Sequence, residues 1–224
     1  MVGLTVVLTF AFALVPTLVP TIVSSGPLAS SGASAQQSIN VVIPDIDPLA
    51  IAANAALEQL RLDSLRLDRP NVLSASYLDL RFAAAELIAT RLDVDASELD
   101  QAWGAADLNH QTALLAALTQ VGVPYKRFAM KPGIGFDCSG LTSFAWSQAG
   151  FDLPRNSTRQ IRVADPRTLE TAQAGDLLRY PGHVMMWLGV GQVVIHSPEP
   201  RQFVEVKIIN NRSMKRSAFG DPTV

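Results

Sequence analysis

The stretch Phe136–Gly150, FDCSGLTSFAWSQAG, contains the only cysteine of this 224-residue chain. Asp137 is a favourable N-cap, and apolar residues then recur at helical spacing until Gly150: Leu141, Phe144 and Ala145. The spacing predicts a helix with Cys138 in its first turn. The helix dipole and free backbone N–H groups there favour a thiolate and lower the thiol pKa, and the same N–H groups can bind an oxyanion.

A single cysteine cannot form a disulfide within the chain, so Cys138 is a reactive nucleophile, an intermolecular cross-linker or a buried structural residue. Its polar and small neighbours Asp137, Ser139 and Gly140 favour the nucleophile.

Two of the three histidines are expected to face each other on neighbouring strands. A two-residue turn at Gly189-Val190 would pair His183 directly with His196, with their Cβ atoms about 4.5–5.5 Å apart. The third, His110, is expected at the surface near a helix start. Zinc bound by Cys138 and this pair is the competing interpretation, but no short-spaced ligand pair is present, so we expect no metal.

These segments resemble the NlpC family of papain-like cysteine peptidases. Phe136–Gly150 is similar to the nucleophile motif of that family, and five further motifs occur in the family's order over about residues 110–210: Gly122-Val123-Pro124-Tyr125, Leu153-Pro154-Arg155 with Ser157 and Gln160, Ala174-Gly175-Asp176-Leu177-Leu178, Gly182-His183-Val184 with Leu188-Gly189, and Val194-Ile195-His196-Ser197-Pro198. The chain departs from the family after Tyr125, where relatives commonly read YxWGG and this sequence reads YKRFAM over 125–130, without the Trp and the glycines. Lys126, Arg127 and Lys131 instead make this rim basic.

The resemblance implies an α+β, papain-like catalytic domain in which a helix bearing the nucleophile packs on an antiparallel sheet. It also implies a cysteine endopeptidase that hydrolyses peptidoglycan stem peptides at the D-glutamyl–diaminopimelate bond without a cofactor. The implied catalytic residues are Cys138 as nucleophile, His183 as base and His196 as orienter. The implied substrate-binding residues are Tyr125, Asp137, Ser139 and Arg155; capping explains Asp137 and Ser139 equally well, and Arg155 could instead pair with Asp176.

The N-terminal 35 residues predict a secretory signal peptide. Residues 2–23 are largely apolar and Ala33-Ser34-Ala35 is an A-x-A cleavage site, although an uncleaved segment would be long enough to anchor the protein in a membrane. We therefore expect a secreted or cell-wall-associated protein, with a linker and acidic helical accessory segment over 36–108 and the catalytic domain over 109–224.

Helices are predicted first and strands later, which is typical of α+β folds. The helices are expected to begin at Asp47, Ser74 and Asp95, with a fourth over 112–121; the first carries the stripe Ala53, Ala56, Leu57, Leu60 and Leu67 and ends at Pro70. Strands are expected at 177–178, 184–188, 193–196 and 203–209.

Charge is divided unevenly along the chain. Residues 36–110 hold 5 Arg against 12 Asp and Glu, giving −7, whereas residues 111–224 hold 13 Lys and Arg against 8 Asp and Glu, giving +5. The total of −2 gives no indication of nucleic-acid binding. The split suggests that the acidic segment docks on the catalytic half and restrains access to Cys138, although two unrelated solvated faces explain it as well. The alternative functions are an amidase or acyltransferase on the same site and an inactive wall-binding scaffold.

Overall fold

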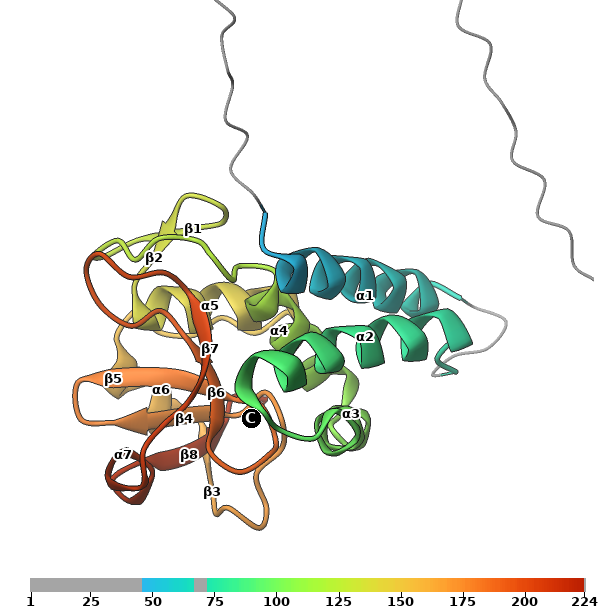
Figure 1. Cartoon of the computed structure of the whole chain (residues 1–224). Coiled ribbons are helices and arrows are strands. Elements are labelled where there is room, and N and C mark those ends of the chain that lie inside the picture. The colour runs from blue at the N-terminus through green and yellow to red at the C-terminus, as the bar shows by residue number, and fades with distance from the viewer. Residues whose placement is uncertain (1–45, 67–71, 224) are drawn as a thin grey trace, which may run out of the picture. The chain divides into compact units, whose positions relative to one another are not determined.

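The computed structural model describes residues 46–66 and 72–223, and begins with two capped helices (Figure 1). Helix α1 (Pro48–Ser64) is capped by Asp47, whose carboxylate accepts from the Leu49 N–H at 2.9 Å, and α2 (Ala75–Leu92) is capped by Ser74. Both predicted starts are confirmed. The predicted apolar stripe of α1 is buried from Ala53 to Leu60, but the helix ends at Ser64; Leu67 and Pro70 lie outside the described residues.

The next two helices lead toward the cysteine. Helix α3 (Ala96–Ala105) is capped by Asp95, as predicted. Helix α4 (Leu108–Leu118) begins four residues before the predicted start at residue 112. The reason is Asp107, which accepts hydrogen bonds from the backbone N–H groups of Asn109 and His110 and so provides an earlier cap.

The second half of the chain forms a hairpin, three helices and a six-stranded antiparallel sheet. The elements are β1 (Met130–Lys131), β2 (Gly135–Phe136), α5 (Cys138–Gln148), α6 (Ser157–Val163), β3 (Asp165–Arg167), β4 (Leu177–Tyr180), β5 (His183–Trp187), β6 (Val193–His196), β7 (Glu205–Ile208), α7 (Asn211–Lys215) and β8 (Ala218–Asp221). The strand order in the large sheet is β3-β8-β4-β5-β6-β7. The predicted α+β class is confirmed. The edge strand β3 and its partner β8 were not predicted, since Asp165-Pro166-Arg167 lacks alternating apolar residues.

The register between β5 and β6 differs from the predicted one by two residues. Met186 pairs with Ile195 and Trp187 with Val194, so the connection is a four-residue loop over 189–192 and not a two-residue turn. Gly189 and Gly191 adopt positive φ angles of 89° and 49° in this loop. A two-residue shift keeps side chains on the same face of a strand, so His183 and His196 remain on one face as diagonal neighbours.

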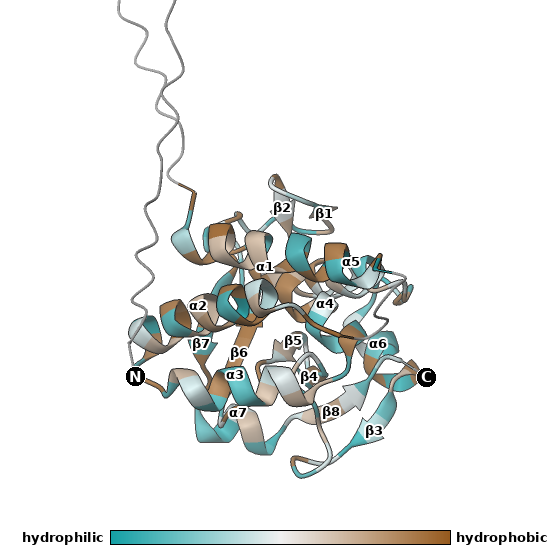
Figure 2. Ribbon diagram, turned by 90° about the vertical axis from the view of Figure 1, so that its right-hand side faces the viewer, coloured by the Kyte–Doolittle hydropathy of each residue, from teal (hydrophilic) through white to brown (hydrophobic). Residues whose placement is uncertain are grey.

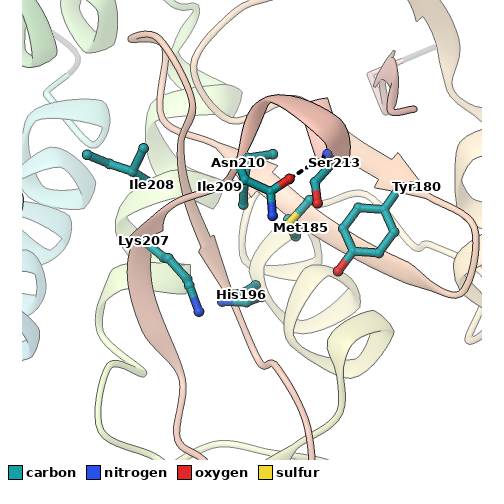
Figure 3. Close-up of a pocket in the computed structure, with 8 residues that line it drawn as sticks. All are labelled: Tyr180, Met185, His196, Lys207, Ile208, Ile209, Asn210 and Ser213. Atoms are coloured by element: carbon teal, nitrogen blue, oxygen red, sulfur yellow. Dashed lines mark hydrogen bonds between the residues drawn. The ribbon is translucent and has the colours of Figure 1, made fainter. Parts of the chain in front are cut away.

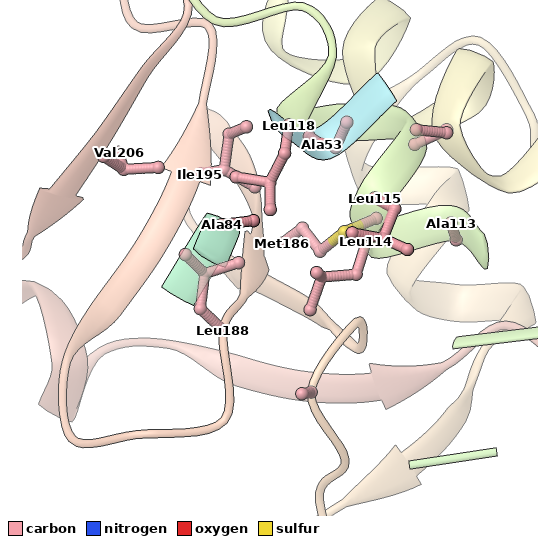
Figure 4. Close-up of a cluster of buried hydrophobic side chains, with 14 of the residues drawn as sticks. Ala53, Ala84, Ala113, Leu114, Leu115, Leu118, Met186, Leu188, Ile195 and Val206 are labelled. Carbon is pink, nitrogen blue, oxygen red and sulfur yellow. The ribbon is translucent and has the colours of Figure 1, made fainter. Parts of the chain in front are cut away.

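The sheet has a different core on each face. Alternate residues of β5, Val184 and Met186, pack into the larger cluster together with the helices, whereas Met185 and Trp187 face a smaller cluster with Phe219. Figure 4 shows side chains of α1, α2 and α4 meeting those of β5, β6 and β7. In Figure 2, β6 is coloured as one of the most hydrophobic segments, in agreement with its complete burial.

The N-terminal helices and the sheet share one core. The described residues, 46–66 and 72–223, belong to one compact unit, and the larger cluster includes Leu57 and Ile88 from α1 and α2 beside Leu115 and Ile195. The Trp103 Nε1–H of α3 also donates to the Leu188 carbonyl at 2.9 Å. The predicted division of this unit at residue 108 stays a prediction.

The predicted signal segment, 1–35, lies outside the described residues. Within the described ranges, none of the helices has the length and apolar character needed to cross a membrane.

Candidate active site

Cys138 is the first residue of α5, as predicted. Asp137 caps the helix by accepting the Gly140 N–H at 2.7 Å, which leaves Cys138 and Ser139 in the first turn, where backbone N–H groups have no acceptor within the helix. The Cys138 side chain is partly exposed. The Cys138 thiol and the backbone N–H groups of the first turn therefore lie together at one helix end.

Gly140 allows the β1–β2 hairpin to approach this helix end. A Cβ atom at position 140 would collide with the backbone carbonyl of Ala129, and the Asp137 N–H donates to that same carbonyl at 3.1 Å. The glycine of the nucleophile motif is thus required by close packing between backbones, and it keeps the hairpin beside Cys138.

The two histidines meet at the end of β5 and β6. Their rings are hydrogen-bonded, with His183 Nε2 2.8 Å from His196 Nδ1, and both side chains are buried. His183 follows a tight turn at Pro181-Gly182, in which Gly182 has a φ of 91°, and it pairs across that turn with Tyr180. The Tyr180 ring lies 5.4 Å from that of His183.

The cysteine lies against the start of β5, the strand that carries His183. Helix α5 packs on β5. Burial raises the pKa of Cys138, and the backbone N–H of Val184, the residue after His183, acts on the sulfur and opposes that rise. The charge of Cys138 also contributes to a raised pKa at Tyr180, after the larger effect of burial. Cys138, His183 and Tyr180 therefore belong to one site.

The thiol pKa differs from the predicted direction. Burial raises the pKa of Cys138 and the charge of Asp137 adds to the increase, which together outweigh the backbone N–H groups of Val184, Ser139 and Cys138. Burial, followed by the neighbouring His196, lowers the pKa of His183 to about 3. At neutral pH the site thus holds a thiol beside a neutral imidazole.

His196 has a second partner, Glu205 of β7. Its Nε2 lies 3.2 Å from Glu205 Oε1, and the two residues are directly paired across the strands. Burial lowers the pKa of His196, and the hydrogen bond and charge of Glu205 only partly offset this.

Three of the predicted substrate-binding residues form one cluster. Arg155 donates from Nη1 and Nη2 to the two carboxylate oxygens of Asp137, at 2.9 and 3.0 Å, and from Nη1 to Ser139 Oγ at 3.0 Å. The alternative pairing of Arg155 with Asp176 is wrong. Tyr125 lies nearby, since burial and then the charges of Cys138 and Asp137 raise its pKa.

Residues 122–221 match the NlpC/P60 family. This part of the chain belongs to the NlpC/P60 family. The matched range contains every predicted site residue, and it extends beyond the motifs to include β8.

Proteins similar to this NlpC/P60 chain include named endopeptidases. A Corynebacterium glutamicum protein named "Probable endopeptidase" is 39% identical over 50% of this chain and 53% of its own length. The Bacillus subtilis "Bifunctional muramidase/DL-endopeptidase CwlT" is 30% identical over 44% of this chain and 32% of its own. The chain thus spans about half or less of the length of these relatives.

A solved structure, RipD from Mycobacterium tuberculosis, is described as a non-catalytic NlpC/p60 domain protein adapted to peptidoglycan binding. It is 25% identical with a TM-score of 0.42, covering 51% of this chain and 98% of that one.

His110 is buried, contrary to the prediction of a surface residue. Its side chain is 0% exposed, with Nδ1 2.8 Å from Asp107 and Nε2 2.9 Å from Asp176. Burial alone lowers the pKa of His110, but the hydrogen bonds and charges of Asp176 and Asp107 outweigh it and raise the pKa.

A possible metal-ligand cluster within the described residues surrounds His110 and excludes Cys138. Ligand atoms of His110, Asp176 and Asp221 lie within 4.8 Å of one another. Both ring nitrogens of His110 are already hydrogen-bonded to carboxylates, and Asp221 pairs with Arg167 at 2.7 Å. The chemistry of this cluster is that of an imidazolium bound by aspartates, and it connects α4 to Asp176, the residue before β4.

Sequence reasoning missed two residues of the site, Tyr180 and Glu205. Tyr180 was detectable, because Tyr180 and His183 flank a Pro-Gly pair that predicts a two-residue hairpin turn. Glu205 was not, because an eight-residue connection separates β6 from β7 and hides their register.

Proposed function

We propose that this protein is an exported cysteine endopeptidase that hydrolyses peptidoglycan stem peptides at the D-glutamyl–diaminopimelate bond. The observation that carries the proposal is Cys138 at a helix N-terminus beside the hydrogen-bonded pair His183–His196, within an NlpC/P60 domain. The names of the relatives support endopeptidase activity, and the apolar N-terminal segment supports export.

The reaction is acyl transfer through a thioester. The Cys138 sulfur attacks the scissile carbonyl carbon as its proton passes to His183, and the backbone N–H of Cys138 stabilises the oxyanion. The tetrahedral intermediate collapses, the C–N bond breaks, and His183 returns the proton to the leaving amine. Water, deprotonated by His183, then hydrolyses the thioester and regenerates the thiol.

The pKa directions support a neutral resting site. A raised pKa for the Cys138 thiol and a pKa of about 3 for His183 disfavour a thiolate–imidazolium pair before substrate binds. Proton transfer to His183 therefore accompanies attack on the substrate. His196 keeps the His183 ring oriented for this step.

The polar surroundings suit a peptide with free charged groups. Asp137, Ser139 and Arg155 form a connected polar cluster beside Cys138, and Tyr125 adds a hydroxyl. Lys126 and Arg127, which precede β1, and Lys131 of β1 are exposed and make a basic rim. Stem peptides are rich in carboxylates, which such a rim attracts.

Digestion of purified muropeptides tests the proposed bond. We expect mass spectrometry to find fragments separated between D-glutamate and diaminopimelate, with a new free amine on the latter. Release of an intact stem peptide from its glycan would indicate an amidase, and transfer to an added amine would indicate an acyltransferase. Binding without cleavage would contradict the enzyme and favour a wall-binding protein.

A further inference from the structure

The His183–His196 hydrogen bond continues to a carboxylate on a third strand. His196 of β6 stands directly opposite Glu205 of β7, and this register is fixed by the buried pair Ile195 and Val206. The resulting chain of contacts is 2.8 Å from His183 to His196 and 3.2 Å from His196 to Glu205. Strand pairing, and not a mobile loop, therefore places the Glu205 carboxylate at the histidines.

The contacts determine where the protons of the two neutral rings lie. A carboxylate only accepts hydrogen bonds, so His196 must carry its proton on Nε2, and its Nδ1 becomes an acceptor. His183 must then donate from Nε2 to that Nδ1. The second nitrogen of His183, Nδ1, is left with its lone pair free to accept a proton.

Without the carboxylate this order is not imposed. A neutral His196 could equally carry its proton on Nδ1 and donate to His183 Nε2, which would place the His183 proton on Nδ1. In that tautomer the His183 nitrogen required as the base is already protonated. The Glu205 carboxylate therefore decides whether Nδ1 of His183 is free to accept a proton.

We propose that Glu205 is a positioning residue of this site, which acts through His196 to keep His183 in the tautomer with an unprotonated Nδ1. The assignment of His183 as the base rests on the proposed function. The tautomers themselves do not, since they are properties of the resting protein.

Three further side chains, from β4, α5 and β7, lie around the histidine pair. Tyr180 comes from β4, Cys138 from α5, and Lys207 lies two residues after Glu205 on β7. Figure 3 shows the Lys207 side chain extending toward His196 at the edge of a cavity of about 380 Å³. Lys207 Nζ lies 3.4 Å from Glu205 Oε1, so the simpler alternative is that Glu205 is only half of an exposed ion pair.

Nitrogen-15 NMR of the imidazole rings tests the tautomers directly. The chain has only three histidines, so single His→Gln variants assign all the ring signals. In the unmodified protein we expect both His183 and His196 as the Nε2–H tautomer, and in Glu205→Ala a mixture of tautomers in both rings. Nδ1–H tautomers in the unmodified protein, or unchanged tautomers in Glu205→Ala, would overturn the proposal.

Hydrolysis kinetics give the second readout. Glu205→Ala should lower kcat about tenfold with KM little changed, as for carboxylates that orient functional histidines elsewhere. Glu205→Gln should recover part of the rate, because its amide oxygen still accepts from His196. The control Lys207→Gln removes the ion pair and should change kcat less than twofold; a loss equal to that of Glu205→Ala would contradict the positioning role.

The two readouts separate the proposals. If the unmodified protein fails to cut muropeptides, the proposed function is wrong, and the NMR tautomers still decide whether Glu205 orders the histidine pair. If cutting occurs and the tautomers ignore Glu205, only the positioning role fails.

Discussion

The contact between His183 and His196 requires that both side chains lie on the same face of the sheet, and it tolerates a register shift of two residues. The predicted register between β5 and β6 was wrong by two residues, yet both imidazoles lie on the same face, with His183 Nε2 2.8 Å from His196 Nδ1. A one-residue error would have placed them on opposite faces. The alternation of side chains between the two faces of a strand was therefore enough to predict from the sequence that His183 and His196 lie close together. Only the structure shows that they are diagonal neighbours and not a directly opposed pair.

The base and the orienter should differ in how much activity their loss removes. We expect His183→Ala to reduce kcat by about 10⁴-fold or more, because nucleophile and base act as a unit. His196→Ala should cost about 10–100-fold, since His196 acts through His183, and His196→Gln should recover part of that loss. The kinetics of muropeptide hydrolysis would measure each loss.

If His196→Ala proved more damaging than His183→Ala, the two roles would be reversed. The circular dichroism spectrum of each variant is the control, because both side chains are buried.

At the scale of elements, the features that could be predicted from the sequence are those determined by contacts between residues close in the chain, such as the starts of helices. The caps Asp47, Ser74 and Asp95 bond to groups two or three residues away, and all three were correctly identified. The predicted surface position of His110 was wrong because its partner Asp176 lies 66 residues further along the chain. No local pattern carries that information.

The buried ion pair between His110 of α4 and Asp176 should make stability depend on pH. His110→Gln leaves the buried Asp176 without its cationic partner, so we expect it to lower the free energy of unfolding by about 3 kcal/mol near pH 6. The folded-state pKa of His110 is raised above its usual 6.5, so the unfolded chain loses the proton first. The stabilisation is therefore complete below pH 6.5 and disappears as pH rises through the folded-state pKa.

Urea unfolding of both proteins between pH 6 and 9 measures this difference. We expect the gap between wild type and His110→Gln to narrow as pH rises. A gap that stays constant over the range would show that His110 is not protonated in the folded protein.

At the scale of the whole molecule, the acidic helices belong to the core of the described unit. Ile88 of α2 is fully buried in the cluster that contains the sheet, while the ion pairs Arg81–Asp100 and Arg91–Asp47 lie inside the helical segment. In Figure 1, α1, α2 and α3 lie to one side and the β1–β2 hairpin to the other. Apolar packing, and not the charge split, accounts for this attachment. Restraint of Cys138 by these helices stays a prediction.

Removal of the helices should unfold the catalytic half. A fragment of residues 109–224 loses the apolar partners of α4 and the sheet, and each buried leucine or isoleucine contributes about 1.5–3 kcal/mol. We expect this fragment to be insoluble or to lack a cooperative unfolding transition, whereas residues 36–224 fold. A soluble, folded fragment that cuts faster than 36–224, with a smaller advantage at high salt, would instead support restraint by the acidic helices.

The central claim is that Cys138 is the nucleophile of a peptidoglycan endopeptidase. Its most direct test is hydrolysis of purified muropeptides by the wild-type protein and by Cys138→Ala, with unfolding curves to confirm that both are folded. We predict cleavage by the wild-type protein and none by Cys138→Ala, because the variant lacks the thiol. The variant should still fold, since a small residue is tolerated at the start of a helix. Substantial turnover by a correctly folded Cys138→Ala protein would contradict the cysteine mechanism.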